Sequence, residues 1–298
     1  VAAAAVVATG LSVSASNGPG GLTLMGAFVC SLVGSSIGFV RMLYFISLGF
    51  ALSIGLSSIA ALLTYNARND LPPLTVAHTS LVAAHGVQLA AFLIYRERVS
   101  WPRLRRLTAE ASRAALAGSK PAARASVWVT CAALYAALLG PNLAALRAGA
   151  AGGAPQGWAA TAARTGIFLQ AVGMAAEVAA DAQMCAFKSV PGNRSRRCDR
   201  GLWAVSTQPN YAGEVIFWVG NFLGGLRGLD FLRTISVIGL AGILAVLRFA
   251  AGSKAARQAD RYGDDAEAVE FWMTHGMFGP NISHIVRRRK MEDPYGWE

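Results

Sequence analysis

The sequence predicts an all-α, polytopic membrane protein with about seven transmembrane helices. Hydrophobic residues make up 54% of the 298 residues and charged residues only 14%, whereas soluble domains carry about 25% charged residues. Several apolar segments reach the roughly 20 residues that a helix needs to cross a bilayer. We expect one membrane domain over residues 1–298, with an N-terminal extension at 1–21, a seven-helix bundle at 22–250 and a polar tail at 251–298.

Seven apolar segments mark the expected spans. They are Leu22–Val40, Met42–Thr64, Leu74–Tyr95, Ser126–Leu146, Trp158–Ala180, Tyr211–Leu226 and Phe231–Ala250. The sixth segment is short and rich in glycine. Its Gly220 and Gly224 form a small-xxx-small pair, which favours close helix packing over ligand binding.

Lysine and arginine are concentrated in alternate connections between these segments. The connection after the third span holds eight of them and the connection after the fifth holds five, and the end of the last span and the tail add eight. This asymmetry follows the positive-inside rule and predicts an outside N-terminus and an inside C-terminus. The net charge of +11 is therefore explained by topology and by membrane lipids as partners, and we expect no nucleic-acid partner.

Two basic regions lie outside the spans. The connection at 96–124 has two open interpretations, an interfacial amphipathic helix with Trp101, Leu104 and Leu107 toward lipid, or a solvated basic loop near anionic headgroups. The tail mixes acids and aromatics from residue 259 to residue 281 and predicts a short folded cap. The run Arg287–Lys290 is interpreted as a solvated charge run.

The cysteines and histidines favour neither a disulfide framework nor a metal site. The four cysteines form no CxxC pair, and the four histidines are scattered. Free cysteines in apolar segments behave as small hydrophobic residues. Disulfides are rare in reducing compartments, so we expect an intracellular membrane, that of the endoplasmic reticulum or another organelle.

Acidic side chains gather around the connection between the fifth and sixth spans. Glu177 and Asp181 are four residues apart and share one face of a helix, and Lys188 follows. Asn210, Tyr211 and Glu214 begin the sixth span. Ionisable groups inside a membrane face the bundle interior or a wet cavity. This set suits a dinucleotide phosphate that enters from the basic side, and the alternative is that the acids pair with neighbouring cations and only join helices.

The run Gly166–Gly220 resembles the C-terminal half of the steroid 5α-reductase-like membrane family, in its branch of uncharacterised bacterial, algal and plant members. That branch shows E-x-x-A-D-x-Q-K-x-x-F, then N-x-G, then G-L-W-x-x-S-R-H-P-N-Y-x-G-E. The matching residues here are Glu177, Ala180, Asp181, Gln183, Phe187, Asn193, Gly201, Leu202, Trp203, Ser206, Pro209, Asn210, Tyr211, Gly213 and Glu214. RYGDD at Arg261–Asp265 also fits the C-terminal end of the branch.

The resemblance implies a membrane-embedded NADPH-dependent reductase of a carbon–carbon double bond in a sterol-like or isoprenoid lipid. It implies that the cofactor is held by Glu177, Asp181, Lys188, Asn210 and Glu214, with Tyr211 in the same motif. Hydride would pass to the β-carbon of the substrate while an acid polarises its carbonyl. No catalytic residue is assigned. Related prenylcysteine methyltransferases share the P-N-Y junction but use S-adenosylmethionine.

Three departures from the family pattern favour an alternative. Met184 replaces the usual lysine after the glutamine, and Thr207 and Gln208 replace the usual Arg-His pair. An acidic residue often found after the last span is also missing. Each change removes charge or donor capacity, so the alternative is a non-catalytic relative that serves as a structural or assembly subunit of a larger membrane complex.

Overall fold

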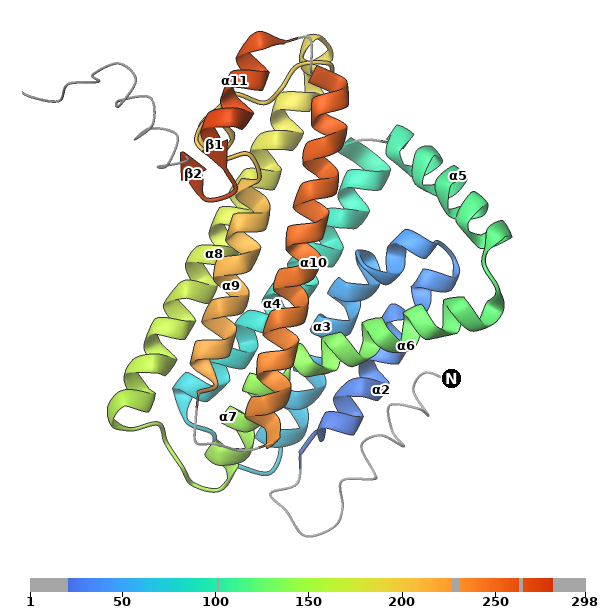
Figure 1. Ribbon diagram of the computed structural model, residues 1–298. Coiled ribbons are helices and arrows are strands. Elements are labelled where there is room, and N and C mark those ends of the chain that lie inside the picture. Colours follow the sequence, from blue (N-terminus) through green and yellow to red (C-terminus); the bar gives the residue numbers. More distant parts are fainter. Residues whose placement is uncertain (1–20, 101, 227–230, 263–264, 281–298) are drawn as a thin grey trace, which may run out of the picture. The chain divides into compact units, whose positions relative to one another are not determined.

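A computed structural model describes residues 21–100, 102–226, 231–262 and 265–280, and element labels follow Figure 1. Residue contacts divide the chain into two compact units. The first comprises the described residues up to Ala171 together with Trp218–Ile243, and the second comprises Val172–Phe217 and the described residues from Leu244 onward. Three helices, α8, α9 and α10, contribute residues to both units, and each unit is described by itself.

The first unit is a set of apolar helices. Its elements are α2 (Leu24–Ser35), η1 (Ser36–Phe39), η2 (Met42–Phe45), α3 (Leu48–Asn66), α4 (Pro73–Tyr95), η3 (Arg96–Ser100), α5 (Pro102–Gly118), α6 (Pro121–Leu138) and α7 (Gly140–Ala150), with parts of α8 (Gly157–Ser189), α9 (Pro209–Gly224) and α10 (Phe231–Tyr262). Small residues let these helices approach closely. A Cβ on Gly86 of α4 would lie 2.4 Å from the backbone nitrogen of Gly55 on α3. Such contacts are typical of helices packed in a membrane.

Three helical segments among the described residues are long and apolar enough to cross a membrane: Met42–Asn66, Pro73–Ser100 and Phe231–Gln258. Helices α6 and α7 qualify together as a fourth but are bent by 43°. The sequence predicts one continuous span at Ser126–Leu146, and the structure divides it at Pro141, which lies in the first turn of α7. Proline has no backbone N–H to donate and its ring clashes with the preceding turn.

The other predicted spans form helices at the expected positions. The first, Leu24–Phe39, is apolar but shorter than the other candidates. Helix α9 has 16 residues, and α8 continues past the predicted end at Ala180 to Ser189. The prediction of a polytopic all-α membrane protein is therefore confirmed, with three spans by length and composition, or four if the bent pair is one span.

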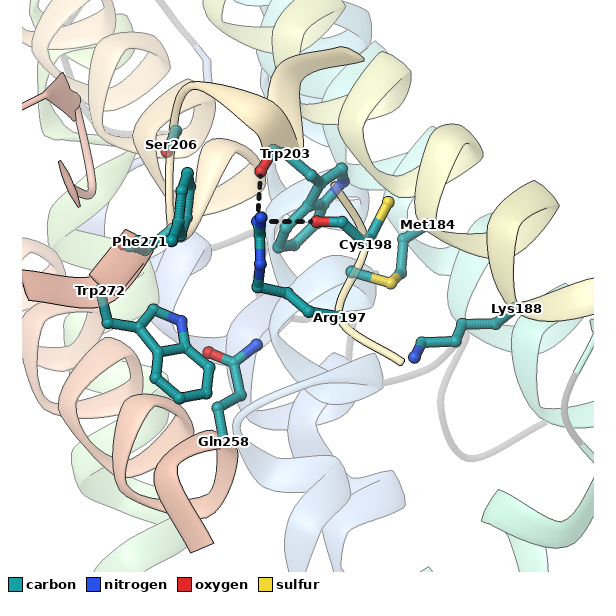
Figure 2. Close-up of a pocket in the computed structure, with 10 residues that line it drawn as sticks. Met184, Lys188, Arg197, Cys198, Trp203, Ser206, Gln258, Phe271 and Trp272 are labelled. Carbon is teal, nitrogen blue, oxygen red and sulfur yellow. Dashed lines mark hydrogen bonds between the residues drawn. The ribbon is translucent and has the colours of Figure 1, made fainter. Parts of the chain in front are cut away.

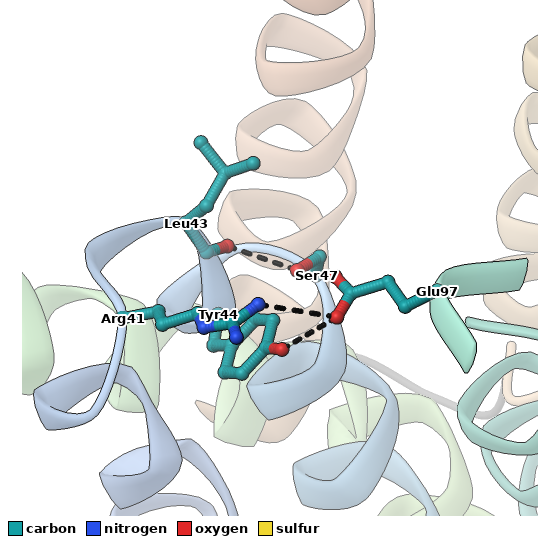
Figure 3. Close-up of polar contacts among 5 residues, drawn as sticks. All are labelled: Arg41, Leu43, Tyr44, Ser47 and Glu97. Carbon is teal, nitrogen blue, oxygen red and sulfur yellow. Dashed lines mark hydrogen bonds and ion pairs between the residues drawn. The ribbon is translucent and has the colours of Figure 1, made fainter. Parts of the chain in front are cut away.

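An ion pair fixes the entry to α3 against the end of α4 in the first unit (Figure 3). Glu97 lies in η3, a π-helical turn, and its Oε2 accepts hydrogen bonds from the Tyr44 hydroxyl at 2.6 Å and from the Arg41 guanidinium at 3.3 Å. The Arg41 and Glu97 side chains are 14% and 16% exposed. A pair this well covered is less screened by solvent than a surface pair.

The second unit contains the C-terminal part of α8, most of α9 and the end of α10. Its short elements are η4 (Pro191–Asn193), η5 (Gly201–Ala204), α11 (Ala266–Thr274), β1 (His275–Gly276) and β2 (Gly279–Pro280). The two strands pair antiparallel. Asp265 caps α11 by accepting hydrogen bonds from the backbone of Glu267 and Ala268. The predicted folded cap is thus confirmed, while Arg287–Lys290 and most of the 1–21 extension lie outside the described residues.

Candidate functional site

The site in the second unit begins with a close approach of α8 and α9. A Cβ on Gly213 would lie 2.6 Å from the carbonyl oxygen of Gly173 and 2.7 Å from the backbone nitrogen of Glu177. Only glycine fits where two helix backbones touch in this way. The glycine of the Y-x-G-E motif therefore sets the spacing of the two helices that carry the predicted site residues.

This approach brings four of the six predicted residues together. The Asn210 side-chain amide donates a hydrogen bond to Asp181 Oδ1 at 3.3 Å. Glu177 lies within electrostatic range of Asp181 and Glu214, and Glu177 and Glu214 are 3% and 9% exposed. Three carboxyl groups and an amide from facing helices form one polar cluster. Such a cluster attracts hydrogen-bond donors, among them hydroxyl and amide groups.

Asn210 contributes a further feature to this cluster. Its side-chain oxygen is buried, and no hydrogen-bond partner for it occurs among the described residues. A buried acceptor without a partner costs free energy. The Asn210 side-chain oxygen can therefore accept a hydrogen bond from a donor group of a ligand.

Lys188, another of the predicted residues, bonds to the loop that follows α8. Its ammonium group donates to the carbonyl oxygens of Asn193 at 3.1 Å and Arg194 at 3.3 Å, and also to that of Arg196. These bonds hold the loop after α8. The ammonium donors are used by the loop, so Lys188 is left to act on an anion mainly through its charge.

Tyr211 lies beside a lysine that the sequence reasoning missed. The ammonium of Lys254 on α10 is 5.0 Å from the centre of the Tyr211 ring and 4.9 Å from that of Trp203. A cation between two aromatic faces is attracted by both rings. Lys254 is one of the eight basic residues counted at the end of the last span and in the tail, and its contact with Tyr211 could not be predicted because the two residues lie far apart in the chain.

An open pocket of about 300 Å3, part of it solvent, lies at this end of the second unit. It is lined by Met184, Lys188, Arg197, Cys198, Trp203, Ser206, Thr207, Gln258, Phe271 and Trp272, most of which Figure 2 labels. The guanidinium of Arg197 stacks 3.9 Å from the centre of the Phe271 ring. It also donates to the carbonyls of Cys198 at 3.1 Å and Trp203 at 3.3 Å (Figure 2). Cations and aromatic rings therefore share this pocket.

Several motif residues hold the turn that carries Trp203, a residue of the pocket wall. Gly201 has φ +57°, and a Cβ there would lie 2.5 Å from Gln183 Oε1. That oxygen accepts a hydrogen bond from the backbone of Leu202 at 2.9 Å. The Trp203 indole donates to the Ala180 carbonyl at 2.8 Å. The motif spacing from Gln183 to Trp203 is thus explained by a turn that these hydrogen bonds hold against α8.

Two further properties bear on the chemistry of the pocket. Cys198 is 3% exposed, and burial raises the pKa of its thiol, which makes it a weak nucleophile at neutral pH. Among the residues that the structure describes, no group of three His, Cys, Asp or Glu side chains gathers as a metal site. The polar cluster and the cationic pocket remain the features suited to a ligand.

The comparison with known families matches residues 40–272 to the family described as "Protein of unknown function (DUF1295)". This region includes every residue of the polar cluster and of the pocket. No curated protein and no solved structure matches the chain. Because the match covers well over half of the 298 residues, the chain belongs to the DUF1295 family, which is a steroid 5α-reductase-like one.

Proposed function

We propose that the protein is a membrane-embedded NADPH-dependent reductase of a carbon–carbon double bond in a sterol-like or isoprenoid lipid. The observation that carries the proposal is the polar cluster on facing helices, in which Asn210 donates to Asp181 at 3.3 Å beside Glu177 and Glu214. It stands in a chain of a steroid 5α-reductase-like family. The reaction and lipid class come from that family resemblance.

The residues present fit the cofactor. The Asn210 oxygen lacks a partner among the described residues and suits an amide or hydroxyl donor of the cofactor. Asp181 and Glu214 would accept from ribose hydroxyls, and Lys188 and Arg197 would attract its phosphates. Bound NADPH supplies a hydride. Lys188 and Arg197 both line a pocket that is open to solvent, where an anion can reach them.

From the distribution of basic residues we also propose the number of membrane spans and the orientation of the chain. Eight basic residues in the connection at 96–124 and five in the connection at 188–200 support seven spans with an inside C-terminus. In this arrangement α2 with η1, α8 and α9 complete the bundle. The absence of disulfide spacing supports an intracellular membrane.

Binding of NADPH by the purified full-length chain tests the proposal. We expect saturable quenching of cofactor fluorescence, with affinity lowered about tenfold by Asn210→Ala or Glu214→Gln, since each removes a charge-assisted or buried hydrogen bond. Glu110→Gln is the matched control because Glu110 is an exposed glutamate on α5 and belongs to the first unit. S-adenosylmethionine is the comparator ligand. Absence of NADPH binding at physiological concentration would refute the cofactor.

A second assay tests the reaction by following NADPH oxidation at 340 nm with an enone sterol and with an isoprenoid enone. We expect turnover that Glu214→Gln reduces together with cofactor affinity. Tight NADPH binding without turnover on either lipid would refute the substrate class while leaving the cofactor proposal standing.

The second candidate is a non-catalytic subunit of a larger membrane complex. The observation that favours it is that the residues at the substituted motif positions are uncharged. Gln208 is 3% exposed and donates to Gln258 at 3.3 Å, and Met184 and Thr207 bring no charge to the pocket that they line. Stoichiometric co-purification with other chains, together with no NADPH binding, would favour this candidate over the reductase.

A further inference from the structure

Helix α5 (Pro102–Gly118) has two different exposed sides. Arg106 and Arg113 are exposed, and so are Ala111 and Ala115. At 100° per residue, the two alanines lie on the side of the helix opposite to the two arginines. The basic connection is therefore helical over Pro102–Gly118, with arginines and alanines exposed on different sides, while the predicted lipid-facing side chains of Trp101, Leu104 and Leu107 lie outside those that the structure describes.

The protein itself covers only part of α5. The helix contacts η2 and η3 within the first unit, and Figure 1 shows it as the blue-green helix at the outer edge of that unit. Ser112 is 4% exposed, and the other described side chains of α5, apart from half-buried Ala109, are exposed. The alanines on one side and the arginines on the other are therefore both exposed.

The position of α5 in the chain places it at a membrane surface. It follows directly on the candidate span Pro73–Ser100, and the bent pair that qualifies as a further span begins at Pro121. Since both flanking segments leave or enter the bilayer here, the helix between them is held within reach of the lipid headgroups. A helix with one polar and one apolar side is stable in that layer when it lies in the plane of the interface.

The charge of the region selects the kind of lipid. Residues 96–124 contain eight arginines and lysines but two glutamates. The exposed apolar side that the structure describes consists of alanines, which offer little area for burial among acyl chains. The affinity of an interfacial helix for a membrane depends on its buried apolar area and on its electrostatic attraction to anionic lipids. Because the apolar area here is small, electrostatic attraction has to supply most of the binding free energy. We propose that α5 is an interfacial anchor that binds the anionic headgroups of the lipid leaflet beside it.

Spin labels on the full-length chain test the orientation of the helix. The four cysteines Cys30, Cys131, Cys185 and Cys198 are replaced by alanine, and a nitroxide is attached at Ala115 or at Ala117. Both positions are exposed alanines, and they face opposite sides of α5. In nanodiscs containing phosphatidylglycerol we expect the label at 115 to collide mainly with oxygen and the label at 117 mainly with a water-soluble nickel complex.

Three outcomes of the labelling would overturn the proposal. Equal access of the nickel complex to both labels would mean a helix in water. Shielding of the label at 115 from both reagents would mean that protein covers this side. The same orientation in pure phosphatidylcholine as in phosphatidylglycerol would mean that anionic lipid has no part in it.

Charge variants of the chain with its native cysteines give an independent readout. Arg106→Gln with Arg113→Gln is compared with Arg68→Gln and Arg147→Gln, two exposed arginines, of which the first lies between α3 and α4 and the second in the last turn of α7. We expect the first variant to lower the affinity for phosphatidylglycerol over phosphatidylcholine by about 25-fold, roughly fivefold for each arginine. The second variant should leave it unchanged. Equal losses in the two variants, or no loss in the first, would overturn the assignment to α5.

Discussion

The contact between α8 and α9 predicts that alanine is not tolerated at Gly213. A Cβ there lies 2.6 Å from the Gly173 carbonyl oxygen, whereas ordinary contact begins at 3.4 Å, so the two backbones would have to separate by about 0.8 Å. Forcing a methyl group into a packed contact costs about 1–3 kcal/mol. The bond between Asn210 and Asp181 is already 3.3 Å long and would pass the limit for a hydrogen bond.

Gly213→Ala is therefore expected to lower the thermal unfolding temperature and to weaken NADPH binding at the same time. The measurements are thermal unfolding of the purified protein and cofactor titration. Gly252→Ala is the matched control, because a Cβ at Gly252 on α10 meets no atom within 4 Å. There alanine should stabilise the helix by about 0.5–1 kcal/mol. Wild-type stability and binding in Gly213→Ala would refute the close approach of the two helices.

Three further predictions concern other parts of the chain. Asn142 on α7 is fully buried, and neither side-chain polar atom has a partner among the described residues, so Asn142→Leu should raise the free energy of unfolding by about 1–3 kcal/mol; a lower unfolding temperature would contradict this. Glu97→Gln should cost about 1–3 kcal/mol because it weakens the bonds from Tyr44 and Arg41, and a double-mutant cycle with Tyr44→Phe should show coupling. Burial raises the pKa of Cys198, so the folded protein keeps a proton that the unfolded chain releases above its thiol pKa of about 8.5. Stability should fall as the pH rises through this window, and a slope unchanged in Cys198→Ala would argue against it.

The positions of the helices were predictable from the sequence because each follows from a local property. Apolar runs of sufficient length give α3, α4 and the first part of α10, and the structure places these helices within a few residues of the predicted bounds. The break between α6 and α7 was also present in the sequence, as Gly140 followed by Pro141. It was missed because hydropathy averages over the residues that interrupt a helix.

The polar cluster was predictable in part. The four-residue spacing of Glu177 and Asp181 puts both on one helical face, and the motif supplies Asn210 and Glu214. That Asn210 reaches Asp181, 29 residues earlier in the chain, depends on how closely the two helices pack. The sequence predicted close helix packing at Gly220 and Gly224. The close approach that brings the cluster together is instead at Gly213.

The roles of the pocket residues were decided by tertiary structure alone. Lys188 bonds to loop carbonyls, Lys254 lies between Trp203 and Tyr211, and Arg197 stacks on Phe271. Hydropathy, helical period and charge distribution act over short stretches of chain, so the sequence by itself determined a helical membrane protein, its basic connections and its family motif. Contacts between α8, α10 and α11 join residues far apart in the chain, and only the folded structure determines which side chain a cation meets.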